Sequence, residues 1–211
     1  MPIGVTADVL RLLNYGSRAQ LEALAKLCGR DEGFKDMALL LEARKRSQEV
    51  LEKAYEAGKV TEEEVLDGVL APGKAYGWID ERDECTACYQ RAKEGFTHLL
   101  GEDSAKAVNV ALAIASQIPS ANERIAELRR LWEMAKISLP EEAVTYDVAS
   151  EVGIELKKKG TYEEAKVLYL ATLEGRRRGH GDEHKHTLAS LTNMGTLLLY
   201  TEDYEGALEY Y

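Results

Sequence analysis

Hydrophobic residues recur at three- and four-residue steps along most of the chain, and this spacing is typical of amphipathic helices. In residues 1–30 it predicts one amphipathic helix, with Thr6 as its N-cap and Gly29 as its terminator, or two helices if Gly16-Ser17 interrupts the stretch. A second helix is expected from Asp31 to Ala57, where Gly58 can end it. The amino-terminal part of the chain is therefore predicted to be largely helical.

The next stretch carries signals for both the start and the end of a short helix. Thr61 is followed three residues later by Glu64, which is the pattern of a capping box. The helix that begins there is expected to continue to about Leu70. Proline and glycine both interrupt helices, so the sequence Ala71-Pro72-Gly73 is expected to end it.

The second half of the chain repeats itself at a fixed spacing. Four residues recur 42 positions later: Gly153 as Gly195, Tyr162 as Tyr204, Ala165 as Ala207 and Tyr169 as Tyr211. Other pairs lie 80 positions apart, which is nearly two periods: Glu94 with Glu174, Gly95 with Gly175 and Gly101 with Gly181. A further unit is therefore expected between them, marked by Leu128, Trp132 and Ala135. A fixed period of this length predicts an array of stacked repeats.

Each repeat is expected to be a pair of antiparallel helices. In one unit, helix A is predicted over Glu142–Lys159 and helix B over Tyr162–Arg176. Gly160 can adopt positive φ and end helix A, and Thr161 with Glu164 has the pattern of a capping box for helix B.

Small residues mark the places where the two helices of a unit approach closely. Gly153 and Ala165 are expected at this contact, because larger side chains would force the helices apart. Tyr162 and Tyr169 are seven residues apart, so they share a face of helix B and should fill the space between successive hairpins. Since one hairpin cannot bury its own apolar face, stacking supplies the core.

Several of these stretches carry a family resemblance. They are the stretch from Thr187 to Gly195, the tetrads that begin at Tyr162 and Tyr204, and the linker Gly181-Asp182-Glu183-His184. Together they resemble tetratricopeptide repeats (TPRs) of the kinesin-light-chain type, and the resemblance covers about residues 80–211. A kinesin light chain proper would carry a long heptad coiled coil upstream, which residues 1–75 do not sustain. The resemblance therefore implies the repeat type and not the motor-adaptor identity.

The resemblance implies an all-α fold, a right-handed α-solenoid of TPR-like helical hairpins with an N-terminal helical region. Two domains are predicted: a helical region over 1–75, as degenerate repeats or a cap, and a repeat array over 76–211. The array stops partway through its last helix B, so we expect a fragment of a longer array. Its last hairpin would then expose an apolar face, and end-to-end self-association through this face is expected.

In such arrays the A helices line a concave groove that holds peptides. Asn109, Glu151 and Asn193 occupy equivalent places in successive A helices, and the family often has a groove-facing Asn there. An amide can both donate to and accept from a peptide backbone, although a solvated polar position is the alternative interpretation. The predicted groove residues are Asn109, Ser150, Glu151, Lys157, Lys158, Thr192, Asn193 and Thr196. Lys157 and Lys158 would favour an acidic ligand segment.

The amino-acid composition limits the classes of partner that the protein is expected to bind. The 211 residues include 27 Lys and Arg against 37 Asp and Glu, and the net charge of −10 argues against nucleic acid or an anionic membrane as the main partner. The first residues lack a secretory signal and no apolar run approaches about 20 residues, so a soluble cytoplasmic protein is expected. Three Cys without a disulfide framework also favour a reducing compartment.

Two clusters contain residue types that can bind metal ions, but both are expected to have structural roles. Cys85 and Cys88 have C-x-x-C spacing, but only His98 is near them, and Cys85 occupies the small-residue place of a helix B. The three histidines His180, His184 and His186 fall in a corner between helices, where a hydrogen-bonding role is expected. No metal, cofactor or catalytic residue is predicted.

The expected function is that of a non-catalytic protein–protein interaction scaffold or adaptor that binds a peptide segment in its groove. The chain shows no nucleophile elbow, phosphate-binding glycine loop or dinucleotide fingerprint, so an enzyme is not expected. Two alternatives stay open. One is a permanent structural subunit of a larger assembly, and the other is the sensor array of a multidomain protein whose catalytic or switch domain is absent here.

Overall fold

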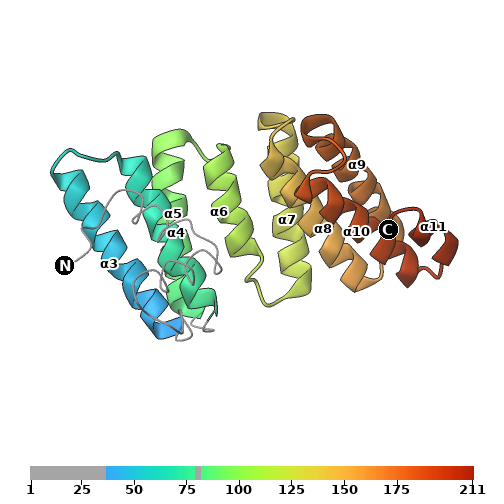
Figure 1. Ribbon diagram of the computed structural model, residues 1–211, viewed down its shortest axis with the longest axis horizontal. Helices are drawn as coiled ribbons and strands as arrows, with labels where there is room; N and C mark the ends of the chain where they lie inside the picture. Colours follow the sequence, from blue (N-terminus) through green and yellow to red (C-terminus); the bar gives the residue numbers. More distant parts are fainter. Residues whose placement is uncertain (1–36, 79–81) are drawn as a thin grey trace. The chain divides into compact units, whose positions relative to one another are not determined.

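The computed structural model describes residues 37–78 and 82–211, with side chains from residue 45 to 70 and from residue 82 onward. The helix predicted in residues 1–30 lies outside the described residues. The described residues form helices and contain no strand (Figure 1). In chain order the helices are α3 (Met37–Glu56), α4 (Glu62–Trp78), α5 (Arg82–Leu100), α6 (Ala105–Ala115), α7 (Ala121–Ser138), α8 (Ala143–Lys159), α9 (Tyr162–His180), α10 (Lys185–Tyr200) and α11 (Tyr204–Leu208). Among the helices searched, none is long and apolar enough to cross a bilayer.

The chain divides into two compact units, Met1–Gly101 and Glu102–Tyr211, which we call the first and the second unit. In the first unit, α4 packs against both α3 and α5. In the second unit, each helix from α6 to α11 packs against the next. The domains predicted over 1–75 and 76–211 stay a prediction.

The turn between α3 and α4 follows the sequence signals. Gly58 has φ of +67°, as expected for a residue that ends a helix. The backbone N–H of Thr61 donates to Glu64 Oε2 at 2.8 Å, and the N–H of Glu64 donates to Thr61 Oγ1 at 3.2 Å. The predicted capping box is therefore confirmed.

The predicted end of α4 near Leu70 is wrong, because the helix continues through Pro72 and Gly73 to Trp78. Packing against α3 and α5 overrides the local preference of these two residues. Gly73 also has a place in the repeat. The interval from Gly73 to Tyr89 equals the interval from Gly153 to Tyr169. What looked like a stop signal is thus the small residue that the repeat has at this helix position.

In the part of the first unit that the structure describes, the helices α3, α4 and α5 correspond to α7, α8 and α9. They are related by the longer repeat interval, the one that separates Gly95 from Gly175. At this interval the bounds of α5 become those of α9. A Cβ built on Gly95 would lie 2.3 Å from Leu66 Cδ2, and one built on Gly175 would lie 2.1 Å from Tyr146 Cε1. Gly95 and Leu66 precede Gly175 and Tyr146 by the same interval. The hairpin of α4 and α5 therefore packs in the same register as the hairpin of α8 and α9.

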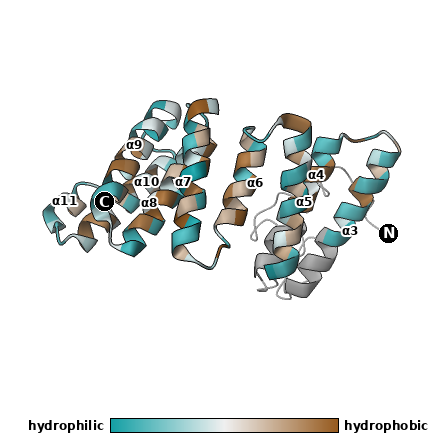
Figure 2. Cartoon of the chain, turned by 180° about the vertical axis from the view of Figure 1, so that it is seen from behind, coloured by the Kyte–Doolittle hydropathy of each residue, from teal (hydrophilic) through white to brown (hydrophobic). Residues whose placement is uncertain are grey.

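Two layers build the second unit. The backbones of α6 and α8, and those of α8 and α10, approach each other, whereas those of α7, α9 and α11 do not approach one another within the described residues. The A helices α6, α8 and α10 therefore form the more tightly spaced layer, as expected for the inner side of a curved stack. Figure 2 shows hydrophobic and hydrophilic residues side by side on these helices, as expected when each buries one face.

The hairpin of α8 and α9 confirms the predicted helix pair, and α9 extends past the predicted Arg176 to His180. Gly160 ends α8 with φ of +86°. The predicted capping box of Thr161 and Glu164 is wrong. The hydroxyl of Thr161 donates to the carbonyl oxygen of Leu156 at 3.0 Å, and Glu164 forms an ion pair with Arg129 of α7.

The close helix contact predicted at Gly153 and Ala165 is confirmed. A Cβ on Gly153 would lie 2.5 Å from Tyr169 Cε1, and both Ala165 and Tyr169 are buried. The half-buried Tyr162 packs against Tyr200 of α10, with ring centroids 6.2 Å apart. Tyr169 thus fills the space inside its own hairpin, whereas Tyr162 joins the hairpin to the next helix.

Candidate peptide-binding surface

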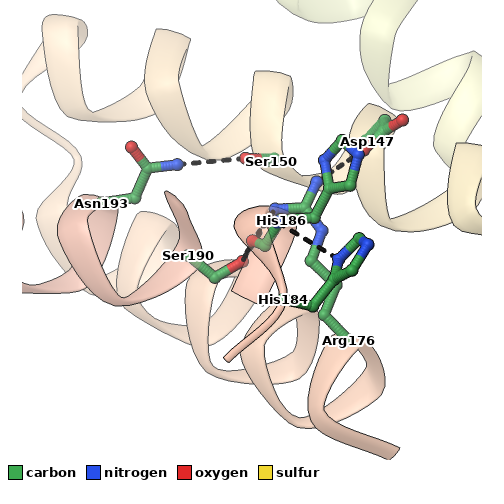
Figure 3. Close-up of polar contacts among 7 residues, drawn as sticks. All are labelled: Asp147, Ser150, Arg176, His184, His186, Ser190 and Asn193. Atoms are coloured by element: carbon green, nitrogen blue, oxygen red, sulfur yellow. Dashed lines mark hydrogen bonds and ion pairs between the residues drawn. The ribbon is translucent and has the colours of Figure 1, made fainter. Parts of the chain in front are cut away.

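The predicted groove residues of the second unit lie on the A helices, and a hydrogen bond joins two of them across neighbouring helices. The side-chain amide of Asn193 on α10 donates from Nδ2 to Ser150 Oγ on α8 at 3.2 Å (Figure 3). Ser150 is buried and Asn193 is half-buried. This bond uses the amide nitrogen to join neighbouring repeats. It leaves the amide oxygen, for which the described residues supply no donor, as the group that can accept from a ligand.

Glu151 is the residue of α8 equivalent to Asn193, one period earlier. Burial raises the pKa of its carboxyl group, and although Lys158 opposes this change, the neighbouring Glu155 and Asp147 add to it. Glu151 is therefore a second acceptor on α8, and its negative charge is poorly solvated. A hydrogen-bond donor or a cation from a ligand would relieve this cost.

The two predicted lysines are not equivalent. Lys158 Nζ lies 2.6 Å from Glu155 Oε1, and Glu155 is also 2.8 Å from Arg124 of α7. Burial opposes the ionisation of Glu155, but hydrogen bonds from Lys158 and Arg124 outweigh it and lower its pKa. The charge of Lys158 is thus largely directed at a buried carboxylate. Lys157 lies with Nζ 5.4 Å from the centroid of the Tyr200 ring, and burial lowers its pKa.

The hydroxyl groups of the predicted threonines donate to their own helix. Thr192 Oγ1 donates to the carbonyl oxygen of Leu188 at 3.0 Å, and Thr196 Oγ1 to that of Thr192 at 2.7 Å. Thr196 Oγ1 also lies 3.1 Å from the hydroxyl oxygen of Tyr211. Asn109 is exposed on α6, and no hydrogen bond joins it to the other predicted residues in the described part of the chain.

Arg176 is the polar residue of this region that the sequence did not reveal. Its side chain is buried, with a relative exposure of 6%. It forms an ion pair with Asp147 of α8 and donates to Ser190 Oγ of α10 at 2.7 Å and to the carbonyl oxygen of His186 at 3.2 Å (Figure 3). It starts the run Arg176-Arg177-Arg178, which looks like a solvated basic patch, so no local signal marks its role.

The histidine cluster has the structural role that was predicted. His184 stacks on His180 with ring centroids 4.5 Å apart, and its Nδ1 accepts from the backbone N–H of His186 at 3.4 Å, which caps α10. Desolvation lowers the pKa of His184, and the neighbouring His180 and His186 lower it further. In the residues searched, no group of three or more His, Cys, Asp and Glu side chains has an arrangement that could hold a metal ion. Cys85 is buried in α5 at the small-residue place, and its thiol is not in a disulfide.

Comparison with known proteins agrees with this geometry. Residues 147–211 match the tetratricopeptide repeat family. None of the curated proteins matches the sequence. Among solved structures, the nearly identical TPR-like repeats of a putative kinesin light chain from Podosopora anserina match at 14% identity, with a TM-score of 0.58, over 95% of this chain and 92% of that one.

Two further solved structures belong to longer proteins, of which this chain spans little more than half. A Rap protein complexed with Competence and Sporulation Factor matches at 17% identity, with a TM-score of 0.66, over 100% of this chain and 57% of that one. NprR in complex with its cognate peptide NprX matches at 18% identity, with a TM-score of 0.61, over 96% of this chain and 57% of that one.

The sequence match and the shared fold define the class. Residues 147–211 match the tetratricopeptide repeat family, as the resemblance predicted, and the fold is that of the TPR-like repeats of a putative kinesin light chain. The predicted fold class, an all-α right-handed α-solenoid of TPR-like hairpins, is confirmed as well. The family and the fold support a role as a protein-interaction scaffold.

Proposed function

We propose that this protein is a non-catalytic scaffold whose A helices α8 and α10 bind an extended segment of another polypeptide. The observation that carries the proposal is the bond from Asn193 to Ser150. It holds the amide of Asn193 in one orientation and leaves its oxygen as an acceptor. A fixed acceptor on an A helix suits a peptide N–H, which every peptide presents whatever its side chains.

The electrostatics of α8 favour a ligand that brings hydrogen-bond donors or positive charge. Glu151 is a poorly solvated acceptor one period before Asn193, and Lys158 already faces Glu155. The lysines alone led us to expect an acidic ligand. We propose instead a ligand segment that places an N–H or a cationic side chain near Glu151. The solved structure of NprR, which shares the fold, contains a cognate peptide and is consistent with peptide binding by an array of this kind.

Exposed apolar residues on the other layer favour the alternative of a permanent subunit. Ile137 at the end of α7 is 81% exposed and Val167 on α9 is 67% exposed. A partner that covers the B helices would bury both residues. This alternative predicts a fixed partner that purifies with the protein and no binding of free peptides.

A peptide library tests the proposal directly. The whole 211-residue chain is screened against displayed random peptides, and affinities of selected peptides are measured for wild type, Asn193→Ala and Glu151→Gln. We expect each variant to lose at least about tenfold in affinity, which corresponds to one or two hydrogen bonds. Asn122→Ala removes an exposed amide of α7, whose oxygen accepts from Lys159 Nζ at 3.0 Å, and serves as the matched control. If no peptide is selected, or if Asn122→Ala weakens binding as much as Asn193→Ala, the groove is not the binding surface.

A further inference from the structure

Two polar bridges join α8 to α10 in the second unit. The first, which we call the amide bridge, is the hydrogen bond from Asn193 Nδ2 to Ser150 Oγ at 3.2 Å. The second, the arginine bridge, passes through Arg176 of α9, which pairs with Asp147 of α8 and donates to Ser190 Oγ of α10 at 2.7 Å (Figure 3). On each A helix, the residue of the arginine bridge precedes that of the amide bridge by three positions, or about one helical turn.

The arginine bridge is the more strongly bonded of the two. The side chain of Arg176 and the residue Ser190 are both buried, whereas Asn193 is half-buried. Arg176 also donates to the carbonyl oxygen of His186 at 3.2 Å, and Ser190 Oγ donates to the same oxygen at 3.1 Å. Hydrogen bonds from a charged group are stronger than the neutral bond from an amide to a hydroxyl. Arg176 therefore has more influence than Asn193 itself on how α8 and α10 are held together.

The repeat fold does not require a polar residue at either of two places in these bridges. At the interval that relates α5 to α9, Arg176 corresponds to Phe96 and Ser150 corresponds to Leu70. Phe96 is fully buried, so an apolar side chain can occupy this helix position. Since apolar residues that replace a buried ion pair often leave stability unchanged or raise it, stability alone does not explain the arginine. Polar residues at places where the fold accepts apolar ones are expected near functional sites.

We infer that Arg176 is a positioning residue for peptide binding, an inference that rests on the proposed function. It holds α8 against α10 so that the amide bridge stays formed and the oxygen of Asn193 keeps one orientation. With its side chain 6% exposed, Arg176 acts through Asn193 and not by contacting the peptide. When Arg176 no longer holds the two helices together, the amide of Asn193 is free to rotate, and its oxygen meets a peptide N–H less often.

Two substitutions of Arg176 test this role. Arg176→Lys keeps the charge but loses the planar fork that bonds to both A helices. Arg176→Phe installs the residue of the first unit. It strands neither partner, because Asp147 is partly exposed and Ser190 keeps its bond to the carbonyl oxygen of His186. Both variants should unfold cooperatively in urea.

Affinity is measured by calorimetric titration with a peptide that wild type selects from the displayed random library. Each Arg176 variant should lose about fivefold or more, as expected for residues coupled through one hydrogen-bond network. Adding Asn193→Ala to either variant should cause no loss beyond that of Asn193→Ala alone, because Arg176 acts through this amide. Arg177→Lys changes the exposed neighbour and should bind as wild type does. Leu131→Val lowers stability from the buried core of α7 and should also keep wild-type affinity.

The outcomes separate this inference from the proposed function. If Asn193→Ala weakens binding while both Arg176 variants bind as wild type does, the inference is overturned and the proposed function stands. Additive losses in the double variants, or an equal loss in Leu131→Val, overturn it as well, since the effect of Arg176 would then not pass through Asn193. If the library yields no peptide, the proposed function fails and this inference fails with it.

Discussion

Gly153 of α8 lies directly against the ring of Tyr169 of α9, so closely that an added Cβ would be 2.5 Å from Cε1. The same relationship recurs one period later, where a Cβ on Gly195 would be 2.9 Å from Tyr211 Cε2. The period of the sequence is thus a period of contacts between a glycine on helix A and a tyrosine that follows it in the same hairpin. The same pair of residues, a glycine on helix A and a tyrosine that follows it, thus marks the repeat in the sequence and allows the two helices of a hairpin to approach closely.

Gly153→Ala should therefore destabilise the protein, by about 1–3 kcal/mol, because the ring of Tyr169 must move to admit the new methyl group. The free energy of unfolding is measured by urea denaturation. Gly179→Ala is the matched control, since Gly179 is also helical, on α9, and has nothing within 4 Å of its added Cβ. That variant should gain up to about 1 kcal/mol from helix propensity. Equal effects of the two substitutions would contradict the close contact.

Arg176→Ala should cost about 2–4 kcal/mol, because it removes a buried guanidinium that contacts α8 and α10 from its place on α9. The partly exposed Asp147 keeps this loss below that of a fully buried pair. The control is Arg177→Ala, whose ion pair with Asp182 is exposed and should be worth less than about 0.5 kcal/mol. Chemical denaturation of the two variants side by side would show whether the neighbouring arginines differ as the structure requires.

His184 should make the protein less stable in mild acid. The pKa of His184 is lowered in the folded state. As the pH drops below the ordinary value of 6.5, the unfolded chain therefore binds the proton more readily than the folded one, and the free energy of unfolding decreases. Protonation also removes the Nδ1 acceptor that caps α10. Melting temperatures are measured across mild acid, from just above neutral pH downward. Asn is a good N-cap that does not titrate, so His184→Asn should flatten the curve in this window. A curve of unchanged slope would assign the dependence to another group.

Glu151→Gln should raise stability at neutral pH. The pKa of Glu151 is raised above its ordinary value of 4.5, so its ionisation is less favourable in the folded state, and the penalty appears as the pH rises past this value. The gain in melting temperature should be present at neutral pH and absent in acid below the ordinary pKa. A variant that is more stable and yet binds peptides less well would separate the function of this carboxylate from its effect on folding.

The repeat could be predicted from the sequence because its marks are residue identities at a fixed spacing. The glycines and tyrosines of the hairpins, the end of α8 at Gly160 and the capping box at Thr61 all follow from local chemistry. The capping box expected at Thr161 fails for a reason outside that segment. Arg129 on α7, the second helix before α9, forms an ion pair with the Glu164 carboxylate. Local patterns are thus reliable where no distant side chain competes for the same atoms.

The polar contacts of the site depend on neighbours that a single helix does not show. Asn193 was expected at the surface from its place in the repeat, yet its partner Ser150 lies on another helix, one repeat earlier. Arg176 lies in a run of three arginines, and its partners Asp147 and Ser190 come from the helices before and after it. The equivalence of α3 and α7 could not be foreseen either, because the two helices share too few residue identities to reveal that they occupy equivalent places.

The three-way contact of Arg176 also bears on how the second unit comes apart under heat or pulling. In a linear stack, terminal helices can detach one at a time, since each repeat contacts only its neighbours. Detaching α8 or α10 here strips a buried cation of its partners, so the three central helices should be released in a single step. Amide exchange along α8, α9 and α10 would then occur at one common rate, with faster exchange confined to the helices on either side.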